Sequence, residues 1–192
     1  MRWEEAVRLS QLLANVPSIR DLHLNFMCEK CLDLDKLPEG YDIAWTSFFL
    51  EAAPYLKEMC ITVWDHWCEI VIDKEERKVL GYSDKTNVEW MPSAPDGFRH
   101  HNLAKLTIYG FQPDDNFIGY IRRVMETSTN LEEISLYDKK MLPCCEDLDP
   151  KINKVAPSML YPQNIEEQEL VRKQVTEGLV IASPHVIIHF RS

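Results

Sequence analysis

The chain has 192 residues, of which 45% are hydrophobic and 10% aromatic, enough for one ordered domain and too few for two large ones. Its formal charge of −10 produces a field that repels phosphate backbones, so we expect no nucleic-acid partner. It has no run of about 18 uncharged apolar residues, so the sequence predicts no transmembrane helix, and we expect no membrane partner.

A short hydrophobic pattern recurs along the chain. Its apolar residues stand at the first, fourth and sixth places, and the closing alternation predicts a short strand with one buried face. Four full copies and a shortened fifth are Ile19–Leu24, Leu56–Ile61, Leu103–Ile108, Leu131–Leu136 and Val186–Phe190.

Apolar residues at helical spacing precede four of these five copies. Proline follows three of the predicted helices, where it cannot continue the helical hydrogen-bond pattern. The predicted helices lie within residues Ala6–Val16, Phe48–Leu56, Phe117–Met125 and Leu170–Val180. A repeated helix, corner and strand indicates a solenoid of stacked units, in which crossover helices join parallel strands.

The spacing of the copies is irregular. Before the third copy, the charged segment Asp73–Lys78 lies between the alternating segments Glu69–Ile72 and Val79–Tyr82. This pattern predicts a β-hairpin within an insertion over residues 65–101. Residues 139–163 are predicted to form a long loop, and residues 32–38 a shorter one, within one domain that spans residues 1–192.

Three consecutive segments are similar to a known family. His101–Phe111, Asp115–Glu126 and Asn130–Tyr137 form a strand, a helix and a second strand. Together they resemble the C-terminal leucine-rich-repeat and FBD-type region of plant F-box proteins, particularly the large set found in grasses. The motifs are most specific over residues 99–138, and the repeat pattern extends the resemblance toward residue 1.

The resemblance implies an α/β fold, an irregular leucine-rich-repeat solenoid of parallel strands and crossover helices, interrupted by the inserted β-hairpin. It also implies the substrate-recognition end of an F-box-type ubiquitin-ligase receptor. In that family an N-terminal F-box binds a Skp1-type adaptor. This chain begins within the repeats, so we expect adaptor binding only through an F-box that it does not contain.

The sequence contains no complete motif for a metal-binding, catalytic or phosphate-binding site. Cys28 and Cys31 have the spacing of half a zinc site, but no second pair with metal-ligand spacing accompanies them. The histidines are scattered, and phosphate-binding glycine loops are absent from the sequence. We therefore expect no catalytic residues, no metal and no cofactor, and we expect that the chain is not an enzyme.

The residues between the buried positions of each strand should face the open concave side of the solenoid. We expect a protein partner, in the family a ubiquitination substrate, to bind there, with the two tyrosines as anchors because rigid aromatic side chains dominate interfaces. The candidate binding residues are Asp21, His23, Asn25, Glu58, Thr62, Lys105, Thr107, Tyr109, Glu133, Ser135 and Tyr137.

Two other functions compete with a ligase receptor. A scaffold or oligomerisation fragment would use the same face without any ligase role. A metal- or thiol-dependent enzyme would need the scattered cysteines and histidines to converge. Because the N-terminus lacks the pattern of a secretory signal, we expect reduced thiols and a cytoplasmic or nuclear location.

Overall fold

The computed structural model describes the backbone of residues 23–28, 30–37, 43–63, 97–138, 161–183 and 185–191. Six strands form one sheet in the order β1-β2-β3-β4-β5-β6. The strands are β1 (His23–Cys28), β2 (Cys31–Leu37), β3 (Glu58–Val63), β4 (Lys105–Tyr109), β5 (Glu133–Tyr137) and β6 (Ile187–Arg191). The helices are η1 (Ala44–Ser47), α2 (Phe48–Ala52), α4 (Asp115–Thr127) and α5 (Ile165–Thr176).

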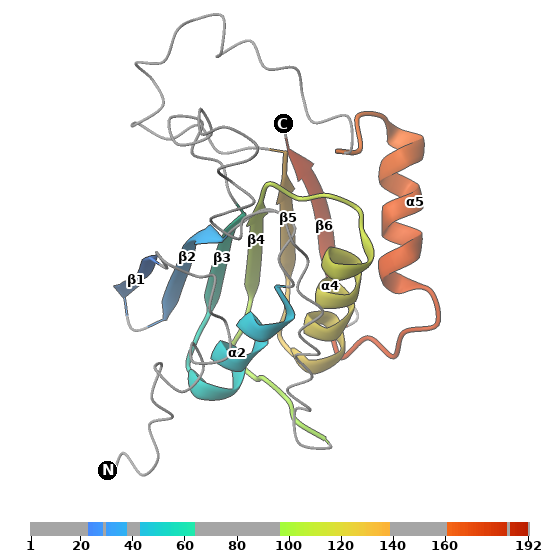
Figure 1. Ribbon diagram of the computed structural model, residues 1–192. Helices are drawn as coiled ribbons and strands as arrows, with labels where there is room; N and C mark the ends of the chain where they lie inside the picture. The colour runs from blue at the N-terminus through green and yellow to red at the C-terminus, as the bar shows by residue number, and fades with distance from the viewer. Residues whose placement is uncertain are drawn as a thin grey trace, which may run out of the picture.

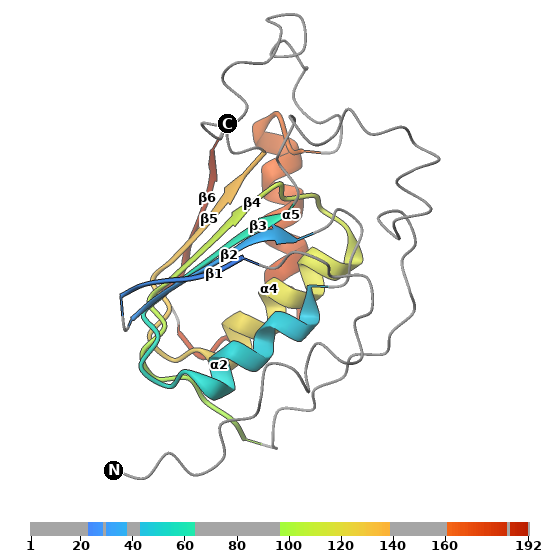
Figure 2. The ribbon, with the colours of Figure 1, turned by 60° about the vertical axis from the view of Figure 1, so that its left-hand side comes forward.

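The sheet and the helices form two layers. The strands β2 to β6 are parallel, and β1 pairs antiparallel with β2 at one edge. The helices cover one face of the sheet, and no described helix covers the other face (Figures 1 and 2). This arrangement confirms the predicted α/β solenoid of parallel strands with interleaved helices.

Alternating apolar residues form the core between the two layers. Each parallel strand sends two apolar side chains toward the helices, and the pair register aligns them into two rows across the sheet. Burying each such side chain contributes about 1.5–3 kcal/mol. The first row is Leu32, Met59, Leu106, Ile134 and Ile188, and the second is Leu34, Ile61, Ile108, Leu136 and Phe190.

The strands start in register because the same backbone contact recurs. The carbonyl oxygen of Lys30 accepts from the N–H groups of Lys57 and Glu58 at 2.7 and 3.0 Å. The carbonyl oxygen of Lys57 accepts in the same way from Ala104 and Lys105 at 2.8 and 3.0 Å. The next step of this ladder joins the starts of β4 and β5. The recurrence keeps each parallel strand level with its neighbour.

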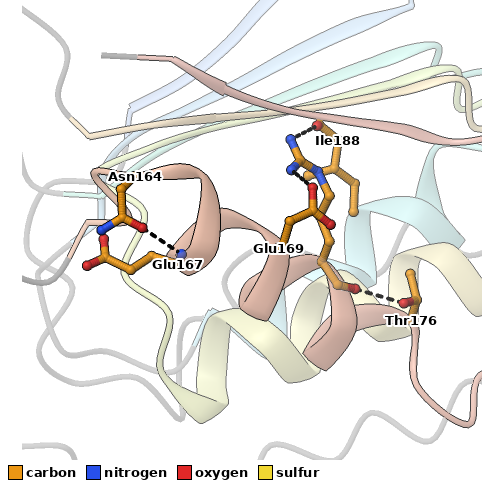
Figure 3. A network of polar contacts seen from close by, with 6 residues as sticks. Asn164, Glu167, Glu169, Thr176 and Ile188 are labelled. Atoms are coloured by element: carbon orange, nitrogen blue, oxygen red, sulfur yellow. Dashed lines mark hydrogen bonds and ion pairs between the residues drawn. The ribbon is translucent and has the colours of Figure 1, made fainter.

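The two long helices, α4 and α5, begin at side chains that accept hydrogen bonds from otherwise unpaired backbone donors. Asp114 caps α4 by accepting from the N–H groups of Asn116 and Phe117 at 2.9 and 3.0 Å. Asn164 caps α5 through the N–H of Glu167 at 2.9 Å, shown in Figure 3. Such caps stabilise a helix by about 1 kcal/mol each and set the residue at which it starts.

The predicted strands from Leu56, Leu103, Leu131 and Val186 all occur, with β3 to β6 at these places. The expected parallel pairing of the first copy is wrong, and so is the predicted loop over residues 32–38. The last two residues of the first copy lie in β1, which is antiparallel to β2, and its other residues lie outside the described part of the chain. The strand β2 replaces the predicted loop. A tight turn between β1 and β2 reverses the chain, so these two strands pair antiparallel and not in parallel as expected.

The helix predicted before the fifth copy ends earlier than its hydrophobic pattern suggested. The helix α5 ends at Thr176, and Gly178 follows it in the left-handed conformation that only glycine adopts readily. Leu170 and Val180, which were assigned to the buried stripe, are exposed. The predicted first helix lies outside the described residues, as do most of the insertion over 65–101 and of the loop over 139–163.

Candidate functional site

The open face of the sheet, defined as the face opposite the helices, carries three rows of mostly polar side chains. Residues in one row are aligned partners on successive strands, so each row runs across the sheet perpendicular to the chain. The first row is Cys31, Glu58, Lys105, Glu133 and Ile187; the second is Asp33, Cys60, Thr107, Ser135 and His189; the third is Thr62, Tyr109, Tyr137 and Arg191.

Most of the predicted binding residues occupy these rows, since the candidates on β3, β4 and β5 are neighbours in register. His23 and Asn25 lie in β1, opposite Asp35 and Asp33, and their side chains lie outside the described part of the chain. Asp21 lies outside the described residues altogether.

Two of the predicted residues are not available to a partner. Thr62 is fully buried and Ser135 is only 1% exposed, although both lie on the open-face side of their strands. Of the others, Glu58 is exposed and the rest are partly exposed. The expectation that every alternate residue faces solvent is therefore wrong at these two positions, because neighbouring atoms cover the short side chains.

Glu133 is the centre of a charged network on this face. The hydroxyl of Ser135 donates to its Oε1 atom at 2.5 Å, and the charged nitrogens of Lys105 and Arg191 lie at 3.8 and 3.4 Å. The Ser135 hydroxyl, followed by the nearby cations and His189, lowers the pKa of the Glu133 carboxyl. Exposed ion pairs contribute little to stability, so the network mainly holds the four side chains in fixed positions.

Tyr109 and Tyr137 form a stacked aromatic pair beside this network. Their ring centroids are 4.5 Å apart and the planes differ by 25°. Burial raises the pKa of the Tyr109 phenol, and Cys60, Tyr137 and Asp33 raise it further. The hydroxyl therefore stays protonated at neutral pH and can both donate and accept a hydrogen bond. Two rings held against each other present a rigid surface that loses little entropy on binding.

The cysteine pair Cys28 and Cys31 lies at the turn between β1 and β2, where the two residues are opposite each other in register. It therefore belongs to an antiparallel hairpin and does not precede a helix, as a thioredoxin-like dithiol would. Cys31 is partly exposed and is not oxidised to a disulfide. Within the described ranges, no group of three or more His, Cys, Asp or Glu side chains is placed to hold a metal ion.

Sequence reasoning missed part of the open face. Asp33 was overlooked because residues 32–38 were read as a loop, although the alternation of Leu32 and Leu34 with Asp33 and Asp35 signals a strand. Arg191 was missed because it follows the last apolar residue of the fifth copy. These residues extend the rows to β2 and β6, and Arg191 completes the network around Glu133.

Parallel strands in sequential order, helices on one face and recurring contacts at the strand starts define an α/β leucine-rich-repeat solenoid. Residues 7–175 match the family described as the At1g61320/AtMIF1 LRR domain, and the chain belongs to this family of plant leucine-rich-repeat domains. Neither the curated proteins nor the solved structures include a match to the chain.

Membership of this family shows the general function of the chain. Leucine-rich-repeat domains are protein-interaction modules and are typically not catalytic, which agrees with an extended face of mostly polar side chains. Among the described helices, none combines the length and the apolar character that a membrane crossing would need.

Proposed function

We propose that this chain is the substrate-recognition end of an F-box-type ubiquitin-ligase receptor and that a protein substrate binds to its open face. The observation that carries the proposal is the alignment of the stacked pair Tyr109 and Tyr137 with the network of Glu133. Aromatic anchors beside oriented charges are the usual composition of a protein-binding surface.

The open face would recognise its substrate without altering it covalently. The tyrosine rings would contribute most of the buried area, and the exposed Glu58 with Lys105 and Thr107 would contribute charge and hydrogen bonds at the rim. Charges at a rim mainly control which partner binds and how fast it associates, whereas buried aromatic residues control how long it stays.

Coupling to a ligase would require a Skp1-type adaptor, which this family of receptors binds through an F-box. We propose that the receptor acts in the cytoplasm or the nucleus, where ubiquitination takes place. Neither Cys31 nor Cys60 is oxidised to a disulfide, which is compatible with these reducing compartments.

Proximity labelling in plant cells tests the proposal, with the chain carrying the labelling enzyme in its wild-type form and as the double variant Tyr109→Ala/Tyr137→Ala. Tyr55→Ala is a matched control, because Tyr55 is 68% exposed and stands at the corner before β3, away from the open face. We expect the wild type and the control to label proteins that carry ubiquitin and accumulate when the proteasome is inhibited. The double variant should lose at least about tenfold of this labelling, as expected for two interface anchors.

Two outcomes would contradict the proposal. If the double variant labels the same proteins as the wild type, the open face is not the recognition surface. If the labelled proteins depend on the two tyrosines but are neither ubiquitinated nor stabilised, the chain is a scaffold. The exposed apolar residues of its last repeat favour this alternative function.

A further inference from the structure

The strand β6 ends the described sheet, and its outer edge carries backbone groups that do not face β5. The N–H of Ile187 donates to the carbonyl of Glu132 on the β5 side at 2.9 Å. Backbone groups alternate along a strand, so those of Ile188 and Phe190 point away from β5. Such an edge is a template on which another strand can pair.

One side chain of α5 covers this edge. The Nη2 atom of Arg172 donates to the carbonyl oxygen of Ile188 at 3.2 Å, and its guanidinium lies 5.0 Å from the centre of the Phe190 ring. Its Nη1 atom lies 2.6 Å from the Oε1 atom of Glu169, which holds the guanidinium in place (Figure 3). Arg172 therefore occupies an acceptor that a pairing strand would need.

Arg172 belongs to a row of residues along the outer side of α5, which we call the end stripe. The stripe consists of Ile165, Glu169, Arg172 and Thr176, whose spacing of four, three and four places them on one side of the helix. The other side faces α4, where Arg122 donates to the carbonyl oxygen of Gln174 at 2.7 Å. The end stripe thus lies at the same end of the molecule as the edge of β6.

The last repeat also exposes unusually much apolar surface. Large hydrophobic residues that are more than half exposed are rare in the described chain, and most of them lie in this repeat. Those in the last repeat are Ile165, Leu170, Val180 and Ile187, and Tyr55 lies elsewhere. Ile165 is in the end stripe and Ile187 is in β6, so apolar side chains flank the open edge.

The end stripe and the edge of β6 are both complementary to themselves. A two-fold axis between Glu169 and Arg172 places Glu169 of one copy opposite Arg172 of the second copy, and Arg172 of the first opposite Glu169 of the second. An axis beside His189 places Ile188 opposite the second copy's Phe190. The outward N–H and C=O groups of Ile188 then face those of Phe190 in the second copy. Arg172 contacts both Ile188 and Phe190, so the end stripe and the edge lie side by side, as a single shared axis would require.

We propose that two copies of this chain associate through the edge of β6 and the end stripe of α5. The two β6 strands pair antiparallel, and the sheet continues from one copy into the other. Arg172 leaves the carbonyl of Ile188 for Glu169 of the second copy, and the carbonyl accepts from the N–H of the partner's Phe190. Arg172 thereby shields the edge of β6 in the monomer and forms the ion pair between the copies in the dimer. The open face of the sheet is not used by this contact.

Charge variants of the full chain test this dimer by sedimentation and light scattering over a range of concentrations. We expect the wild type to dimerise and Glu169→Arg to weaken the dimer at least about tenfold, because it places arginines opposite one another. The double variant Glu169→Arg/Arg172→Glu restores opposite charges and should restore the dimer. Glu166→Arg makes the same charge change at an exposed residue of α5 outside the end stripe and should leave the dimer intact.

Hydrogen exchange locates the contact independently of these variants. In the dimer, the backbone N–H groups of Ile188 and Phe190 should gain protection as the concentration rises, while the N–H of Ile187 is protected in both states. A wild-type chain that stays monomeric at every concentration overturns the proposal. The proposal is also overturned if Glu169→Arg and Glu166→Arg weaken the dimer equally, or if dimerisation leaves the hydrogen-exchange rate of the Phe190 N–H unchanged.

Discussion

The Nδ1 atom of His100 accepts a hydrogen bond from the backbone N–H of Leu103 at 2.9 Å. Since Nδ1 is an acceptor, the neutral ring carries its proton on Nε2, which donates to the carbonyl of Ala53 at 3.2 Å. The buried ring therefore joins the corner that follows α2 to the segment before β4. The bond from Leu103 requires the neutral form, because a protonated Nδ1 could not accept, whereas Nε2 can donate to Ala53 in either form.

His100 should make the stability of the chain depend on pH. Burial lowers the pKa of His100 below its ordinary value of 6.5. Below pH 6.5 the unfolded chain binds a proton that the folded chain excludes, so the free energy of unfolding is full above this pH and falls as the pH decreases. Urea unfolding between neutral and mildly acidic pH measures this slope.

The variant His100→Phe isolates that contribution. It should cost about 1–3 kcal/mol at neutral pH, because it leaves the N–H of Leu103 and the carbonyl of Ala53 without their partner. It should also flatten the slope below pH 6.5, whereas His101→Phe at the exposed neighbouring position should retain it. An unchanged slope in His100→Phe would show that other groups cause the pH dependence.

Two asparagines join successive repeats at equivalent places. The Nδ2 atom of Asn102 donates to the carbonyl of Pro54 at 2.9 Å, and that of Asn130 donates to the carbonyl of His101 at 2.6 Å. Asn130→Asp should cost about 0.5–1.5 kcal/mol, because a carboxylate cannot donate. Asn116→Asp is the matched control: in the first turn of α4, the same change adds a favourable negative charge and should not destabilise. Equal losses in thermal unfolding would contradict this assignment.

Gly110 and Gly178 both adopt positive φ, at 74° and 69°, but their surroundings differ. A Cβ atom on Gly110 would overlap the carbonyl oxygen of Val63, whereas one on Gly178 would meet no atom within 4 Å. Gly178→Ala should therefore cost only the left-handed backbone penalty, about 1–2 kcal/mol. Gly110→Ala should cost about 2–5 kcal/mol, because β3 must also move. Equal midpoints in chemical denaturation would refute the close contact.

Tyr161 closes the ends of two strands. Its hydroxyl lies 2.8 Å from the carbonyl oxygen of Leu136 and 3.1 Å from that of Arg191. Tyr161→Phe should cost about 1–3 kcal/mol by removing the donor from these partly or fully buried groups. Tyr55→Phe, at an exposed position, is the control and should leave the free energy of unfolding within about 0.5 kcal/mol of the wild type.

The same tyrosine predicts a loss of stability in strong alkali. Burial raises the pKa of Tyr161 to about 12, above its ordinary value of 10.0. Between these values the unfolded chain releases a proton that the folded chain keeps, so stability falls as the pH rises through this window. Comparing wild type and Tyr161→Phe by denaturant unfolding on both sides of pH 10 measures the difference, which should shrink at the higher pH.

Repeated hydrophobic spacing predicted most of the fold. The copies beginning at Leu56, Leu103 and Leu131 became β3, β4 and β5 because one buried face and one open face force strict alternation. The same alternation predicted that Tyr109 and Tyr137 lie on the open face. Their register as neighbours followed from parallel stacking of equal units, which the strand pairs confirm.

The errors arose where local pattern competed with a longer-range pairing. Residues 32–38 looked like a loop because aspartates alternate with the leucines, yet pairing with β3 makes them the strand β2. The first copy failed for the complementary reason, since its hydrophobic pattern does not reveal an antiparallel turn. For Leu170, hydrophobic character suggested burial, but only neighbouring elements can cover a side chain, and none of the described ones does.

Local spacing and side-chain volume were enough to predict the repeating unit, the parallel strands and the residues that alternate onto the open face. Three features became visible only in the folded chain: Thr62 and Ser135 are covered, Arg191 contacts Glu133, and Arg172 shields the edge of β6. Each of these depends on atoms contributed by distant segments, whose positions are set by packing across the whole solenoid and not by the pattern within any one repeat.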